Sequence, residues 1–124
     1  MAKILIVDDS ALSRRISRRI LVEGGHDVTE ATDGLTALEQ YVLARPELVL
    51  LDVTMAEMNG LEVLRQLLAI DPAARIVMAT ADVQTSTRSL AMDGGALGFV
   101  NKPFVSETVL KIVAGALAGE GATA

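Results

Sequence analysis

Four short aliphatic runs of this chain are followed by residues that could do chemistry. Asp8 and Asp9 follow the run 3–7, and Asp52 follows the run 48–51. Thr80 follows the run 75–79, and Lys102 comes shortly after the run 96–100. Asp52 alone could merely cap a turn or a helix. In open parallel α/β sheets, however, ligands bind at the carboxyl ends of the strands. If these runs are strands of one sheet, all five side chains meet in one crevice.

Three carboxylates that converge on one crevice repel one another unless a cation lies between them. Oxygen ligands without His or Cys favour a hard cation, and Mg²⁺ also keeps several waters and accepts a phosphate oxygen. An acyl phosphate on Asp52 would replace one negative charge by about two. Mg²⁺ and Lys102 can balance that charge, and Thr80 offers a hydroxyl to a phosphoryl oxygen. These residues therefore predict phosphoryl transfer to a carboxylate nucleophile.

Strand and helix patterns alternate five times along the chain. The expected strands cover 3–7, 26–31, 48–52, 75–79 and 96–100. The expected helices lie between 10 and 24, between 33 and 45, at 61–68, at about 83–92 and at about 105–116. The run 48–51 shows no polar alternation, which is typical of a strand buried on both faces of a parallel sheet. Because each parallel crossover needs a helix, the pattern predicts an α/β fold with helices on both faces.

Apolar residues at helical spacing predict which side of each helix faces the sheet. The expected inward residues are Leu12, Ile16 and Ile20, then Leu35, Leu38, Tyr41 and Val42, then Leu61, Val63, Leu64, Leu67 and Leu68, and finally Val105, Val109, Ile112, Val113 and Ala116. Four arginines surround the rest of the first helix, namely Arg14, Arg15, Arg18 and Arg19. They predict a solvated face, with a basic patch for an acidic partner as the alternative.

Composition limits the class of protein. A chain of 124 residues is expected to form one domain, 1–124, with a frayed tail at 119–124. Hydrophobic residues make up 51% and aromatic residues 2%, so the core is expected to be aliphatic; without cysteine there is no disulfide or thiolate metal site. No apolar run reaches the roughly 20 residues of a membrane span, and no signal region opens the chain, which predicts a cytoplasmic protein without a membrane partner. The net charge of -5 argues against direct nucleic-acid binding.

From Lys3 to about Ala118, the chain resembles the receiver domain of two-component response regulators. The segments that carry the resemblance are Val7-Asp8-Asp9-Ser10, Leu51-Asp52-Val53-Thr54-Met55, Met58-Asn59-Gly60, Thr80-Ala81 and Lys102-Pro103-Phe104. Each motif is weak alone, but the five in this order on the expected strands are specific. The resemblance implies a flavodoxin-like, doubly wound, five-stranded parallel sheet of order 2-1-3-4-5 with five helices.

The resemblance also implies the roles of the strand-end residues. Asp52 would be the phosphoacceptor. The ligands of Mg²⁺ would be Asp8, Asp9, Asp52 and the backbone carbonyl of Thr54. Lys102 would face the phosphate, and the need to aim it inward predicts a cis bond between Lys102 and Pro103.

The resemblance also implies an output switch, for which Thr80 would supply the hydroxyl and Phe99 the aromatic ring. The resemblance implies a stand-alone, chemotaxis-type receiver that is a phosphoacceptor and not an enzyme. Its expected partners are a sensor histidine kinase or phosphotransfer domain upstream and a protein target downstream. Contact with that target would use the face formed by the fourth helix, the fifth strand and the fifth helix.

Two residues depart from the family pattern. Ala56 stands where proline is common, and Phe99 stands where tyrosine is frequent. A phosphate sink in a phosphorelay stays open as an alternative function. An aspartate-nucleophile Mg²⁺ phosphohydrolase of the haloacid dehalogenase type is disfavoured, because such enzymes typically carry an acid where this chain has Thr54. The intact acidic residues, Thr80 and Lys102 oppose a pseudo-receiver that only binds partners.

Overall fold

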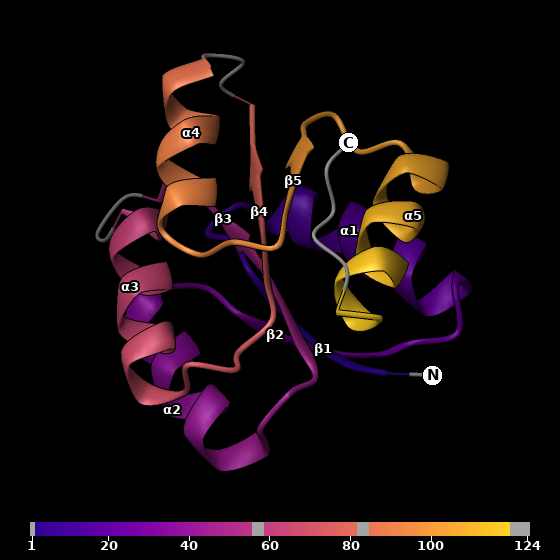
Figure 1. Ribbon diagram of the computed structural model, residues 1–124. Coiled ribbons are helices and arrows are strands. Elements are labelled where there is room, and N and C mark those ends of the chain that lie inside the picture. Colours follow the sequence, from indigo (N-terminus) through magenta and orange to yellow (C-terminus); the bar gives the residue numbers. More distant parts are fainter. Residues whose placement is uncertain (1, 56–58, 82–84, 120–124) are drawn as a thin grey trace.

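The computed structural model describes residues 2–55, 59–81 and 85–119, and strands and helices alternate along them (Figure 1). The strands are β1 (Lys3–Val7), β2 (Asp27–Ala31), β3 (Leu48–Asp52), β4 (Ile76–Thr80) and β5 (Gly98–Asn101). The helices are α1 (Ala11–Glu23), α2 (Gly34–Ala44), α3 (Gly60–Ile70), α4 (Thr85–Asp93) and α5 (Ser106–Leu117). Ala56, the expected start of α4 near Val83, and the tail beyond 119 lie outside the described residues.

The described strands form one parallel sheet of order β2-β1-β3-β4-β5. Val7 lies opposite Leu51 and Asp52 lies opposite Ala79, so neighbouring strands end at nearly the same level. Helices α1 and α5 cover one face of the sheet, and α2, α3 and α4 cover the other (Figure 1). The expected flavodoxin-like fold is confirmed.

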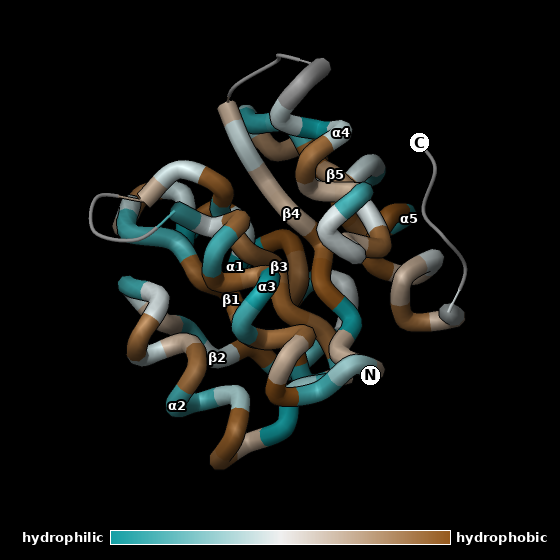
Figure 2. Tube along the Cα trace, turned by 60° about the vertical axis from the view of Figure 1, so that its left-hand side comes forward, coloured by the Kyte–Doolittle hydropathy of each residue, from teal (hydrophilic) through white to brown (hydrophobic). Residues whose placement is uncertain are grey.

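An aliphatic core lies on each side of the sheet. Successive strand residues point to opposite faces. Leu5 and Leu51 therefore join the core beneath α2 and α3, whereas Ile6 and Leu50 join the core beneath α1 and α5. Figure 2 shows these strands as brown segments in the interior. Each buried Leu or Ile contributes about 1.5–3 kcal/mol, so the two cores are the main support of the strand ends.

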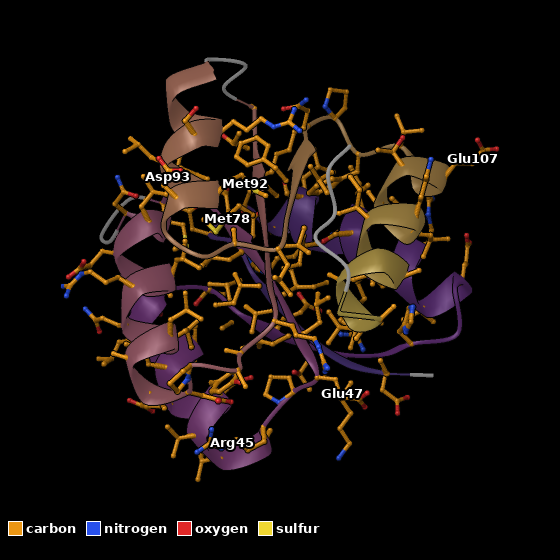
Figure 3. The ribbon with its side chains drawn as sticks, in the orientation of Figure 1. Arg45, Glu47, Met78, Met92, Asp93 and Glu107 are labelled. Carbon is orange, nitrogen blue, oxygen red and sulfur yellow. The ribbon has the colours of Figure 1, made fainter. Side chains whose placement is uncertain are left out.

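The inward faces predicted for α3 and α5 are largely confirmed. Val63, Leu64 and Leu67 are fully buried, and Leu61 and Leu68 pack at the edge of the same core. The buried residues of α5 are Val109, Ile112, Val113 and Ala116. Figure 3 shows the side chains of Met78 (β4) and Met92 (α4) between α4 and the sheet. Met92 packs against the core cluster to which Met78 belongs.

Four of the predicted inward residues are exposed instead, and the prediction was wrong for them: Leu12, Leu35, Val42 and Val105. The buried residues of α1 are Ser17, Ile20 and Leu21, which lie from the middle of the helix onward. In α2, Ala37 and Tyr41 face the sheet. Val105 is the N-cap of α5 and precedes the helical face.

Helix ends follow the predicted signals. Ser10 and Asp33 cap α1 and α2, since their side chains accept hydrogen bonds from the backbone N–H groups of Ser13 and Thr36. Arg45 ends α2 in a left-handed conformation, with φ of 47°. Within the described residues, no helix is long and apolar enough to cross a membrane.

Candidate functional site

The carboxyl ends of β1 and β3 bring three carboxylates together. Val7 and Leu51 are register partners, so Asp8 and Asp52 follow side by side on adjacent strands. One carboxylate oxygen each of Asp8, Asp9 and Asp52 lies within 4.8 Å of the others. Asp8 is 3% exposed and Asp52 is 5% exposed, whereas Asp9 is open to solvent. The predicted acidic cluster is therefore present at the expected edge of the sheet.

Lys102 enters this cluster from the end of β5. Its Nζ lies 2.8 Å from Asp8 Oδ2 and 3.5 Å from Asp52 Oδ2, and its side chain is only 16% exposed. The ring of Phe104 lies beside the ammonium, with its centroid 5.8 Å from Nζ. The Lys102–Pro103 bond is cis, as predicted.

The surroundings of Asp52 disfavour the charged form of its carboxylate. Burial and the neighbouring charge of Asp8 raise its pKa to about 6, against the lowering effect of Lys102 and of a hydrogen bond from the backbone N–H of Thr54. Near neutral pH, Asp52 is thus ionised in a place that disfavours its charge. A bound cation would relieve that cost.

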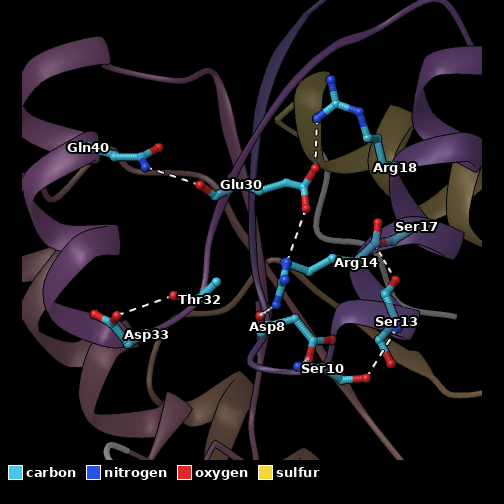
Figure 4. Close-up of polar contacts among 10 residues, drawn as sticks. All are labelled: Asp8, Ser10, Ser13, Arg14, Ser17, Arg18, Glu30, Thr32, Asp33 and Gln40. Carbon is cyan, nitrogen blue, oxygen red and sulfur yellow. Dashed lines mark hydrogen bonds and ion pairs between the residues drawn. The ribbon is translucent and has the colours of Figure 1, made fainter.

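Asp8 is held by the N-cap residue of α1 and by an arginine of that helix. Its Oδ1 accepts a hydrogen bond of 2.9 Å from the backbone N–H of Ser10. Its backbone carbonyl accepts a hydrogen bond of 2.8 Å from Arg14 Nη1 (Figure 4). Arg14 Nε also donates to Glu30 of β2 at 3.1 Å, and Arg18 donates to the other oxygen of the same carboxylate. Arg14 thereby connects the metal-ligand candidate Asp8 to the neighbouring strand.

The interpretation of the α1 arginines as a solvated face was wrong for Arg14. Its side chain is 17% exposed and lies between Asp8 and Glu30, whereas Arg15 and Arg19 are exposed as predicted. The expected strand order places β2 beside β1, but residue spacing does not tell which arginine of α1 faces Glu30.

The donor set fits Mg²⁺. All three clustered side chains offer carboxylate oxygens, the ligands that Mg²⁺ prefers, and two of them are buried against a single ammonium group. Partly uncompensated negative charge of this kind favours a divalent cation. Thr54 is exposed directly beyond the cluster, and the role of its backbone carbonyl stays a prediction.

Thr80 and Phe99 are both buried, at 1% and 7% exposure. Thr80 ends β4, and its backbone carbonyl accepts a hydrogen bond of 2.8 Å from the N–H of Lys102. Phe99 is the register partner of Met78 and belongs to the core on the α3 and α4 side. The structure thus joins Thr80 to the Lys102 segment and places Phe99 in the layer beneath α4.

The loop after Asp52 returns tightly to the end of β3. The backbone N–H of Gly60 donates to the carbonyl of Val53 at 2.7 Å. A Cβ atom at position 60 would lie 2.0 Å from the backbone oxygen of Asp52. Gly60 is therefore required for the close approach of α3 to the candidate site. Sequence reasoning noted Gly60 only as part of a motif.

Comparison with known proteins agrees with this geometry. The family model of the response regulator receiver domain matches residues 4–114. The chemotaxis protein CheY of Bacillus subtilis is 42% identical over 112 residues, which are 90% of this chain and 93% of the relative. CheY of Thermotoga maritima is 37% identical over 110 residues, 88% of this chain and 92% of the relative.

Solved structures show the same fold. The Vibrio cholerae chemotaxis protein CheY4 superposes with a TM-score of 0.86 at 33% identity and covers 92% of this chain and 97% of that one. A LuxR-family two-component response regulator from Aurantimonas superposes with a TM-score of 0.92 at 32% identity, over 99% of this chain and 89% of that one. The fold, the strand-end residues and the family match agree, and the chain belongs to the response regulator receiver domain family.

Proposed function

We propose that this protein accepts a phosphoryl group on Asp52 from a sensor histidine kinase or a phosphotransfer domain and passes the signal on through protein contacts. The observation that carries the proposal is the convergence of Asp8, Asp9, Asp52 and Lys102 within one cluster. The family and the chemotaxis proteins among its relatives support a chemotaxis-type pathway in the cytoplasm.

Asp52 is the best nucleophile among the three acids. Both oxygens of Asp8 are engaged, one by the N–H of Ser10 and the other by Lys102 at 2.8 Å. The contact of Lys102 with Asp52 is longer, at 3.5 Å. Asp9 belongs to the same cluster but is exposed, so its carboxylate is solvated and less confined than that of the buried Asp52. Asp52 is therefore buried, lies near the ammonium group of Lys102, and is bound by that group less tightly than Asp8 is.

In the proposed step, a carboxylate oxygen of Asp52 attacks the phosphorus of a phosphohistidine. The P–N bond breaks, and its electron pair stays on the imidazole nitrogen, which takes up a proton. Asp8, Asp9, Asp52 and the Thr54 carbonyl would hold Mg²⁺, which would neutralise charge on the phosphoryl oxygens. Lys102 would face a phosphoryl oxygen of the product.

Output through α4, β5 and α5 is part of the proposal. Thr80 would donate its hydroxyl to the phosphoryl group, and Phe99 would respond from the layer beneath α4. Among the described side chains of α4, Ala91 is the only one that is fully buried, whereas Leu90 is 59% exposed. A helix with so few buried anchors can shift at low cost, which supports this face as the output surface.

Labelling with a small acyl-phosphate donor tests the proposal. Mass spectrometry should show one added phosphate on the wild type in Mg²⁺, and none on D52N. A matched control is D27N, because Asp27 is exposed at the amino end of β2, on the far edge of the sheet; it should label like the wild type. Equal labelling in EDTA, or of D52N, would refute the proposal.

A further inference from the structure

Ser13, in the first turn of α1, contacts the ammonium group of Lys102. Lys102 Nζ donates to Ser13 Oγ at 3.2 Å, beside its ion pairs with Asp8 at 2.8 Å and Asp52 at 3.5 Å. An ammonium group has three N–H donors, and these three acceptors match them. Because the side chain is only 16% exposed, water cannot freely substitute for a missing acceptor.

We infer that Ser13 is a positioning residue for phosphoryl transfer. Its hydroxyl holds the Lys102 ammonium group at the site while Asp8 binds the metal and Asp52 accepts the phosphoryl group. The inference rests on the proposed function. In that function Asp8 binds a metal and Asp52 becomes an acyl phosphate, so both acceptors are altered during the cycle. Ser13 Oγ is neutral, lies on a helix, and is the one of the three that keeps its chemistry throughout.

Ser13 is itself held in place by its neighbours along α1. Its backbone N–H donates to Ser10 Oγ at 3.2 Å, and its backbone carbonyl accepts from Ser17 Oγ at 2.9 Å (Figure 4). Ser10 in turn donates its N–H to Asp8 Oδ1. The first turn of α1 is thus tied to the same carboxylate that Lys102 contacts, and Ser13 Oγ has a defined place relative to it.

The contact can be measured without any phosphoryl donor. The chain has three lysines, and Lys3 and Lys111 are exposed. In ¹⁵N-lysine NMR spectra, the wild type should show one ammonium signal protected from exchange with water, from Lys102. S13A should lose that protection, S13T should restore it, and the signals of Lys3 and Lys111 should stay unchanged in every variant.

The same variants are then labelled with the acyl-phosphate donor in Mg²⁺. The two carboxylates still hold the ammonium group in S13A, so its labelling rate should fall only about threefold to tenfold, and S13T should restore it. T29A is the control, because it removes an exposed hydroxyl from the middle of β2, a strand that carries none of the proposed site residues. Its labelling rate and Lys102 signal should match the wild type.

The outcomes separate this inference from the proposed function. A wild type that takes no phosphate overturns the proposed function, and the inference with it. If the wild type labels normally, the inference alone is overturned by any of three results: an S13A rate equal to the wild type, a slower S13A with an unchanged Lys102 signal, or a wild-type spectrum without a protected lysine.

Discussion

Replacing Asp52 by asparagine should stabilise the metal-free protein, although it removes the proposed phosphoacceptor. The pKa of Asp52 is raised from 3.8 to about 6 by burial and by Asp8. A difference of about two pKa units corresponds to about 3 kcal/mol of disfavoured charge at neutral pH. Asparagine keeps the shape and removes the charge. We therefore expect D52N in EDTA at pH 7.5 to gain about 1–3 kcal/mol in free energy of unfolding.

The pH dependence has a definite sign. Because the folded-state pKa of Asp52 lies above its unfolded value, the folded state binds more protons between pH 3.8 and about 6. The free energy of unfolding of the wild type should then fall as pH rises through this window, relative to D52N. The gap between the two proteins should be fully open above about pH 7 and should close toward pH 4.

Urea melts in EDTA and in Mg²⁺ test both statements. Mg²⁺ at 100 times its dissociation constant should stabilise the wild type by about 2.7 kcal/mol, and D52N less, because it has lost a charged ligand. The gap should therefore shrink or reverse. D27N, which removes one charge at the far edge of the sheet, should follow the wild type throughout. A D52N protein no more stable than the wild type in EDTA would refute the claim that repulsion and burial act on this carboxylate.

Three further predictions concern the scaffold of the site, each measured by urea melts. G60A should lose about 1–3 kcal/mol, since its Cβ would lie 2.0 Å from the Asp52 carbonyl oxygen; an unchanged melt would mean that this approach relaxes freely. R14K should lose about 1 kcal/mol, because an ammonium on a straight stem cannot reach the Asp8 carbonyl and Glu30 together; wild-type stability would contradict that bridge. L67A, at a fully buried position, should lose about 2–5 kcal/mol, and L43A, at 85% exposure, less than about 0.5 kcal/mol. Equal losses for the two leucines would contradict the assigned faces of α2 and α3.

The strands and their ends could be predicted because their signal is local. Leu48 to Leu51 are all buried on both sides of the sheet, so an unbroken aliphatic run was sufficient evidence. The change from aliphatic to acidic at Asp52 marked the strand end equally well. Residues that follow parallel strands must meet at one edge, which is why the acidic cluster followed from topology alone.

Helix faces were harder to predict because hydrophobic identity does not reveal which stripe faces the sheet. Leu12 is exposed, whereas Ser17 on the same helix is buried. The Ser17 hydroxyl donates to the carbonyls of Ser13 and Arg14 within its own helix, so it needs no outside partner and can replace an apolar residue. The contacts of Arg14 and Ser13 were missed for a related reason. Their partners come from other elements, and even the expected strand order does not show which side chains of α1 reach them.

The unequal contacts of Lys102 with the two buried acids suit the proposed coupling of metal binding and phosphoryl transfer. The shorter contact of its ammonium group is with Asp8, at 2.8 Å, and the longer one is with Asp52, at 3.5 Å. On the proposed assignment, a divalent cation bound to Asp8 would weaken the shorter contact. The ammonium group would then depend on its contacts with Ser13 and Asp52. Metal binding would therefore favour a shift of the lysine toward the proposed phosphoacceptor, and the hydroxyl of Ser13 would limit that shift.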